Sequence, residues 1–128
     1  MAQGANHKIP TISTHVLDTE RGLPAVGIHV TLYRIADDGR PFRLTQALTD
    51  ADGRVADLLD RPLTAGDYRL EFNLVQEAED APPGGKAVAA TDPFFRRLTV
   101  DLRVTDTSRS YHVPLLLAPF SMTTYRGS

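Results

Sequence analysis

The sequence predicts an all-β fold, either a sandwich or a barrel, and three observations support that prediction. Apolar and polar residues alternate along several runs of the 128-residue chain, as they do in strands with one buried face. Clusters rich in Gly and Asp, which are typical of turns, separate these runs. Roughly seven or eight runs follow one another at a spacing of about 8–12 residues, as in sandwich and barrel proteins.

The alternation defines each expected strand. In the first clear run, Ile28, Val30 and Leu32 form one apolar row. Threonine and valine are common in such runs because a pleated surface accommodates them well. The other clear runs are 68–72, 98–104 and 113–117, and the turn signals lie at 20–22, 37–39, 50–53 and 64–67.

One segment departs from this alternation. Residues 74–81 contain helix-forming residues and few β-branched ones. They predict one short surface helix, which the Pro-Pro-Gly-Gly sequence at 82–85 would end. A glycine-rich loop is expected from there to about residue 93.

Length and composition indicate a single globular domain. The chain is 41% hydrophobic and 23% charged, close to ordinary globular values. Its length suits one domain and leaves no room for a second. We expect residues 1–8 to form a flexible N-terminus and residues 9–128 to form the domain.

Charge, cysteine content and hydropathy argue against several classes of protein. The net charge is −2 and the basic residues are scattered, so nucleic acid is not an expected partner. The absence of cysteine excludes disulfides, thiolate zinc sites and a cysteine nucleophile, and the four histidines lack metal-ligand spacing. No apolar run approaches the roughly 20 residues of a membrane helix. With neither a signal peptide nor a peroxisomal ending, a cytoplasmic location is expected.

Three segments together resemble one known family. They are Ile-Ser-Thr-His-Val-Leu-Asp at 12–18 with Gly-Leu-Pro-Ala at 22–25, Thr-Asp-Ala-Asp-Gly-Arg at 49–54, and the stretch 111–128, which begins Tyr-His-Val-Pro-Leu-Leu-Leu and ends Tyr-Arg-Gly-Ser. In this order they resemble the 5-hydroxyisourate hydrolases, also called transthyretin-related proteins, over nearly the whole chain. Met122 replaces an aromatic residue that is frequent in the family, and the loop at 82–93 is longer than usual.

The resemblance implies a fold, an assembly and a reaction. The fold would be a transthyretin-like β-sandwich of two four-stranded sheets with one short helix. The assembly would be a homotetramer with active sites at the interface between two dimers. The reaction would open the ring of 5-hydroxyisourate with water during urate breakdown, giving 2-oxo-4-hydroxy-4-carboxy-5-ureidoimidazoline. No metal or organic cofactor is expected.

The resemblance also implies which residues act. The catalytic residues would be His15, Arg54, His112 and Ser128; His15, Arg54, Tyr125 and Arg126 would bind substrate. Histidine suits proton transfer because its ordinary pKa is about 6.5. Arginine can grip a planar anionic heterocycle at two points. Which histidine acts as the base stays open at this stage.

Two other functions remain to be compared with catalysis. Transthyretin shares the fold and carries small aromatic ligands, so the fold alone does not establish an enzyme. Carrier relatives lack the paired histidines and the Tyr-Arg-Gly-Ser ending, and this chain has both. A purely structural sandwich domain would assign no role to a pocket that gathers His15, Arg54 and His112.

Overall fold

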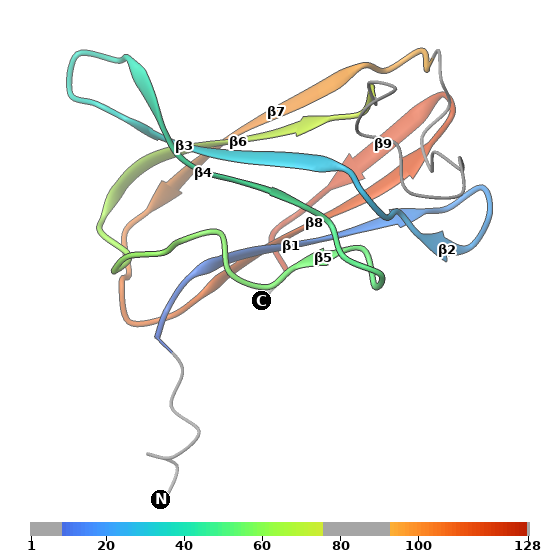
Figure 1. Cartoon of the computed structure of the whole chain (residues 1–128). Helices are drawn as coiled ribbons and strands as arrows, with labels where there is room; N and C mark the ends of the chain where they lie inside the picture. The colour runs from blue at the N-terminus through green and yellow to red at the C-terminus, as the bar shows by residue number, and fades with distance from the viewer. Residues whose placement is uncertain (1–8, 76–92, 128) are drawn as a thin grey trace, which may run out of the picture.

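A computed structural model describes residues 9–75 and 93–127 of the chain. In this part of the chain the strands form two sheets that pack face to face (Figure 1), which confirms the predicted all-β sandwich. The strands are β1 (Ile12–Asp18), β2 (Leu23–Pro24), β3 (His29–Ile35), β4 (Pro41–Leu48), β5 (Arg54–Val55), β6 (Gly66–Asn73), β7 (Arg97–Val104), β8 (Tyr111–Ala118) and β9 (Ser121–Thr124).

The two sheets differ in their pairing. One has the order β4-β3-β6-β7, is antiparallel throughout, and has the four strands expected. The other has the order β2-β1-β8-β9, and β5 also pairs with β1, so it has five strands rather than four. The extra strand arises because two short strands, β2 and β5, share one edge of β1. Between β1 and β8 the pairing is parallel.

The core lies between the sheets, where the alternation in the sequence predicts it. Leu70 and Phe72 of β6 face Val16 and Leu115 of the other sheet's strands across a single apolar cluster, and all four are fully buried. Their neighbours Glu71 and the other alternate residues of β6 are only half-buried. Burying such side chains contributes roughly 1.5–3 kcal/mol each, so the core fixes which face of every strand points outward.

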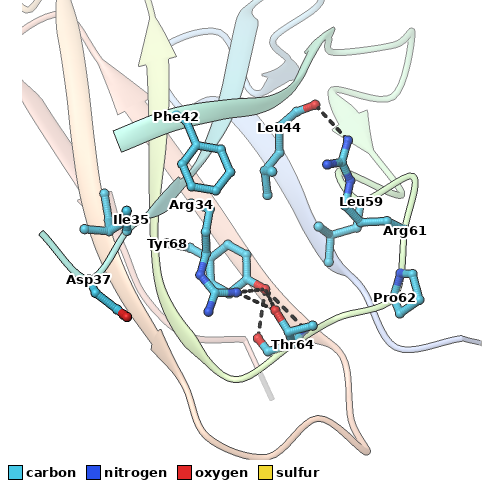
Figure 2. A pocket seen from close by; sticks show the side chains of 11 residues that line it. Arg34, Ile35, Asp37, Phe42, Leu44, Leu59, Arg61, Pro62, Thr64 and Tyr68 are labelled. Carbon is cyan, nitrogen blue, oxygen red and sulfur yellow. Dashed lines mark hydrogen bonds between the residues drawn. The ribbon is translucent and has the colours of Figure 1, made fainter. Parts of the chain in front are cut away.

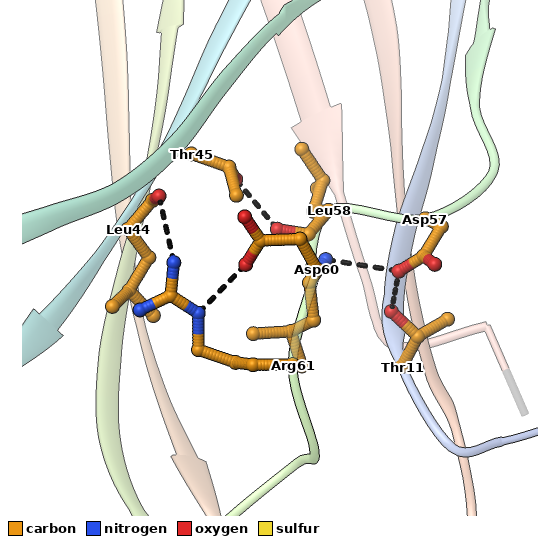
Figure 3. Close-up of polar contacts among 8 residues, drawn as sticks. Thr11, Leu44, Thr45, Asp57, Leu58, Asp60 and Arg61 are labelled. Carbon is orange, nitrogen blue, oxygen red and sulfur yellow. Dashed lines mark hydrogen bonds and ion pairs between the residues drawn. The ribbon is translucent and has the colours of Figure 1, made fainter.

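The connection from β5 to β6 crosses from one sheet to the other. Figure 3 shows its polar contacts: the Thr11 hydroxyl donates to the Asp57 carboxylate, which also accepts the Leu59 amide at 2.9 Å. Farther along, the Arg61 guanidinium donates to Asp60 at 2.7 Å. Leu58 and Leu59 are buried beneath these contacts. The crossing is therefore fastened to the body of the domain just after β5, which steadies that short strand.

Three predicted segments lie wholly or largely outside the described residues, and one of them is the glycine-rich loop expected from residue 82 to about residue 93. The predicted helix covers residues 74–81, but only Leu74 and Val75 are described, and these two are not helical. The predicted flexible N-terminus, residues 1–8, is also outside this range. Among the described residues no helix is long and apolar enough to cross a membrane.

The outer faces of the two sheets carry different chemistry. On the outer face of the β4-β3-β6-β7 sheet, the Arg69 guanidinium lies 2.8 Å from the Asp101 carboxylate, and Arg103 lies 2.8 Å from Asp67. The outward positions of β1 and β8 are neutral or histidine, namely Ser13, His15, Leu17, His112, Pro114 and Leu116. One sheet thus presents a charged surface, whereas the other presents a largely neutral one that contains two histidines.

Candidate active site

The parallel pairing of β1 and β8 brings the two histidines to one face. Ser13 is the Cα partner of His112, and His15 is the partner of Pro114. Partners in a sheet point to the same side, and the intervening Thr14 is buried in the core. His15 and His112 therefore both lie on the outer face of this sheet, although 97 positions separate them in the sequence.

A tight turn brings Arg54 to the same face. Arg54 begins β5 and is the Cα partner of His15. The Asp50 carboxylate accepts hydrogen bonds from the amides of Asp52 at 2.9 Å and Arg54 at 3.0 Å. These bonds, with smaller contributions from the positive charges of Arg54 and His15, lower the pKa of Asp50. Asp50 thus shapes the turn that presents Arg54 beside His15.

The same turn requires glycine at position 53. Gly53 has φ of 77°, a left-handed conformation that other residues rarely adopt. A Cβ at this position would lie 2.4 Å from the Val16 carbonyl oxygen and 3.1 Å from Cβ of Pro24. Because the Gly53 carbonyl also accepts the Val16 amide at 2.7 Å, the turn lies directly against β1.

The ring of His15 is anchored through one nitrogen. His15 Nε2 lies 2.9 Å from the carbonyl oxygen of Asp52. A carbonyl oxygen only accepts hydrogen bonds, so this contact places a proton on Nε2. In the neutral ring Nδ1 then carries the free lone pair, and it is the nitrogen available to a water molecule or a substrate.

The ring of His112 is anchored by a hydroxyl group. Ser13 Oγ lies 2.9 Å from His112 Nδ1. Burial of His112 lowers its pKa below the ordinary value of 6.5, and the positive charges of Arg54 and His15 lower it further. His112 is therefore neutral at pH 7. The strand register places all three predicted residues, His15, Arg54 and His112, on the same face of the sheet.

The C-terminal segment runs beside β8 and ends near His112. Thr124 is the partner of Leu115, and the same register returns as a bridge between Gly127 and His112. The Gly127 amide donates to the His112 carbonyl at 2.8 Å. A Cβ on Gly127 would lie 3.1 Å from Cδ2 of the His112 ring, so the close approach of this segment depends on glycine. Pairing is interrupted between these two points because Pro114 has no amide hydrogen.

Within a single chain, the other predicted substrate-binding residues lie elsewhere. The Arg126 guanidinium sits over the ring of Tyr111, 5.6 Å from its centroid. Tyr111 is buried with the core residues, so Arg126 lies on the side of β8 away from the histidines. Tyr125 and Arg126 line a cavity of about 350 Å³ between β7 and the C-terminal segment. Ser128, also predicted as catalytic, lies outside the described residues.

A second cavity, of about 440 Å³, opens beside β4 (Figure 2). Arg34 in its wall donates to the Ala65 carbonyl at 2.7 Å, to the Tyr68 hydroxyl at 3.2 Å and to the Thr64 hydroxyl. The guanidinium also lies 4.9 Å from the Tyr68 ring centroid. These contacts fasten the turn before β6 to β3, so they stabilise the fold. No histidine lines this cavity, and it is separate from the His15–Arg54–His112 cluster.

The sequence missed three features that shape the site. Ser13 lies in the family-like segment 12–18 but has no role that the sequence predicts. The Asp52 carbonyl is a main-chain group, and Gly127 acts through the absence of a side chain. The first would follow from knowing that β1 and β8 are parallel with Ser13 opposite His112. Among the described residues no group of three or more His, Cys, Asp or Glu is arranged to hold a metal ion.

Comparison with known proteins places the chain among relatives of matching length. Residues 12–127 match the HIUase/Transthyretin family. The 5-hydroxyisourate hydrolase of Deinococcus radiodurans is 44% identical over 121 residues, covering 93% of this chain and 97% of that protein. The enzyme of the same name from Halalkalibacterium halodurans is 40% identical over 123 residues, with coverage of 91% and 97%.

Solved structures agree with the sequence matches. The 5-hydroxyisourate hydrolase of Klebsiella pneumoniae superimposes with a TM-score of 0.69 at 33% identity, covering 93% of this chain and 99% of that one. Sea bream transthyretin in complex with thyroxine gives a TM-score of 0.73 at 27% identity, with coverage of 91% and 93%. By the extent of the family match and the identity to these relatives, the chain belongs to the HIUase/Transthyretin family.

Proposed function

We propose that this protein is a 5-hydroxyisourate hydrolase of urate degradation. The observation that carries the proposal is the gathering of His15, Arg54 and His112 on one sheet face from three separate strands, with each histidine ring anchored through one nitrogen. Relatives named for this activity are 40–44% identical over more than nine-tenths of the chain. The product is 2-oxo-4-hydroxy-4-carboxy-5-ureidoimidazoline.

The arrangement supplies what hydrolysis of a cyclic amide needs. The oxygen of water bonds to a ring carbonyl carbon and a ring C–N bond breaks, so one proton leaves the water and one reaches the departing nitrogen. The open nitrogens, Nδ1 of His15 and Nε2 of His112, exchange these protons. The Arg54 guanidinium holds the anionic ring and stabilises the negative charge that develops on the carbonyl oxygen.

We expect the charge on Arg54 to influence the pKa of His112. Burial and two positive neighbours lower the His112 pKa, so we expect an NMR titration of its ring to have a midpoint below pH 6.5. Replacing Arg54 by glutamine removes one positive charge, and the midpoint should rise. Folded His112 binds its proton less readily than the unfolded chain does. The contribution of neutral His112 to the free energy of unfolding is therefore fully present above pH 6.5 and decreases as the pH falls below that value. An unchanged His112 titration midpoint in Arg54→Gln would contradict the proximity of Arg54 and His112.

The outer face of β1 and β8 also fits a subunit interface. Its outward residues lack the ion pairs that cover the other sheet, and the half-buried Leu17 and Leu116 add apolar surface beside the histidines. Interface centres are depleted of charged residues in this way. The proposed assembly is a homotetramer in which the sites lie between two dimers. Sedimentation equilibrium should give four chains of 14.0 kDa each, and a monomeric mass would contradict the assembly.

The activity is tested on freshly generated substrate. Urate is oxidised to 5-hydroxyisourate, and its ultraviolet absorbance is followed at neutral pH with and without the protein. The proposal predicts decay well above the spontaneous rate and in proportion to protein concentration. The alternative, a transthyretin-like carrier of small ligands, predicts decay at the spontaneous rate from the folded, assembled protein.

A further inference from the structure

Ser13 is a polar residue of the site with no role yet assigned. It lies half-buried on the outer face of β1, between the core residues Ile12 and Thr14. Its hydroxyl contacts Nδ1 of His112 at 2.9 Å, and no other described residue makes a hydrogen bond with it. The parallel register places the two Cα atoms side by side, so the contact follows from strand pairing rather than from a flexible loop.

The two histidines of the site have anchors with different properties. The Asp52 carbonyl beside His15 accepts only, which holds the proton on Nε2 of that ring. A serine hydroxyl has one proton and two lone pairs, so it can donate to Nδ1 or accept from it. It also adds no negative charge, whereas a carboxylate at this position would raise the His112 pKa and favour the charged ring at neutral pH.

We propose that Ser13 is a positioning residue for His112, an inference that rests on the proposed hydrolase function. Its hydroxyl holds the ring so that Nε2 is open to the substrate, and it supports both protonation states. While the ring is neutral and Nε2 is to accept a proton, Nδ1 bears hydrogen and Ser13 accepts from it. After Nε2 gives up a proton to the departing nitrogen, the same geometry is restored. Ser13 keeps its own proton throughout and forms no covalent bond.

Three variants separate positioning from a merely structural effect. Ser13→Ala removes the hydroxyl, and Ser13→Thr keeps it on a residue that suits a strand. Thr14→Val is the matched control, because the buried Thr14 hydroxyl donates to the Val113 carbonyl across the same strand pair on the core face. Each variant is characterised by steady-state kinetics, thermal unfolding, and NMR of the His112 ring nitrogens, assigned with a His112→Asn spectrum.

We expect Ser13→Ala to lower kcat roughly tenfold with KM changed by less than about twofold, since the substrate contacts remain. The NMR signals of the His112 ring nitrogens should shift towards the values of a mixture of tautomers. The ring pKa should decrease by about half a unit, because the bond lost from the charged ring is stronger than the bond lost from the neutral one. Ser13→Thr should restore all three readouts, whereas Thr14→Val should reduce stability without moving the His112 signals or kcat.

Several outcomes would overturn the assignment of Ser13. Turnover by Ser13→Ala at the wild-type rate would do so, as would a loss of turnover with unchanged His112 nitrogen signals. Equal effects of Thr14→Val on kcat would reduce the role of Ser13 to strand stability. The nitrogen signals report the Ser13–His112 bond without any substrate, so failure of the positioning role is distinguishable from failure of the proposed hydrolase function, which the wild-type decay assay alone decides.

Discussion

Replacing His15 by alanine is expected to lower kcat/KM by roughly 30- to 150-fold, which corresponds to about 2–3 kcal/mol in the barrier. The His15 ring lies on the outer face of β1 and contributes little to the core. Its replacement removes one hydrogen bond to the Asp52 carbonyl. Folding should therefore survive. The loss follows from the chemistry: without the open Nδ1, one proton transfer has to proceed through bulk water.

Arg54→Ala should give a loss of at least the same size. Arg54 is exposed and lies in a two-residue strand, so the domain loses little packing when the side chain is shortened. What disappears is the positive charge beside the two histidines, and with it the stabilisation of the developing oxyanion.

Matched controls come from elsewhere in the chain. Arg40 lies in the turn between β3 and β4 and is highly exposed, so Arg40→Ala removes an arginine without touching the site. His29→Gln changes a histidine on the other sheet. Both controls should hydrolyse 5-hydroxyisourate at the wild-type rate in the absorbance assay. Near-normal turnover by both His15→Ala and Arg54→Ala would refute the proposed site. An equal loss of turnover in either control would show that the loss arises from impaired folding.

The second large effect is expected from Gly53→Ala. The left-handed conformation costs an alanine about 1–2 kcal/mol, and the 2.4 Å approach of the new Cβ to the Val16 carbonyl oxygen forces main-chain atoms apart. Overpacking of this kind costs roughly 1–3 kcal/mol. The free energy of unfolding should decrease by about 3 kcal/mol, and turnover should decrease too because the turn carries both the Asp52 carbonyl and Arg54.

Gly22→Ala provides the control for this substitution. Gly22 has φ of 70°, close to the 77° of Gly53, but a Cβ there would meet no atom within 4 Å. Its cost should be limited to the backbone conformation, and turnover should be unchanged. Urea unfolding of both variants measures the difference, which isolates the contact with β1. Equal destabilisation of the two variants would show that the turn can move away from β1 freely.

Alternation in the sequence predicts long strands such as β6 and β7, because each of them turns an apolar row towards the core. The run 68–72 lies within β6, and the run 98–104 lies within β7. β5 has only two residues, too few to show any alternation, and its place beside β1 depends on a turn closed by Gly53. The sequence therefore predicts a turn at 50–53 but not its position against His15.

The site was predicted through the family resemblance, and its internal geometry was not. The strand register places His15, Arg54 and His112 on one sheet face, whereas their catalytic roles stay a prediction. The family resemblance also implies that Arg126 binds substrate, but within a single chain its guanidinium lies over the ring of Tyr111. The pairing of Ser13 with His112 joins residues 99 positions apart, and such contacts depend on which strands are neighbours and in which direction they run. No local pattern in the sequence contains that information.

The alternation of β1 has a consequence for how the gene can change in length. His15 faces outward between the inward residues Thr14 and Val16, so core and site are interleaved along the same strand. Deleting or inserting one codon within β1 would turn His15 towards the core and a core residue outward. Such a change would disrupt the core and the candidate site at once. Turns such as residues 36–40, which carry neither, can accept changes in length. Length variation among natural homologues should therefore be concentrated in such turns and absent from β1.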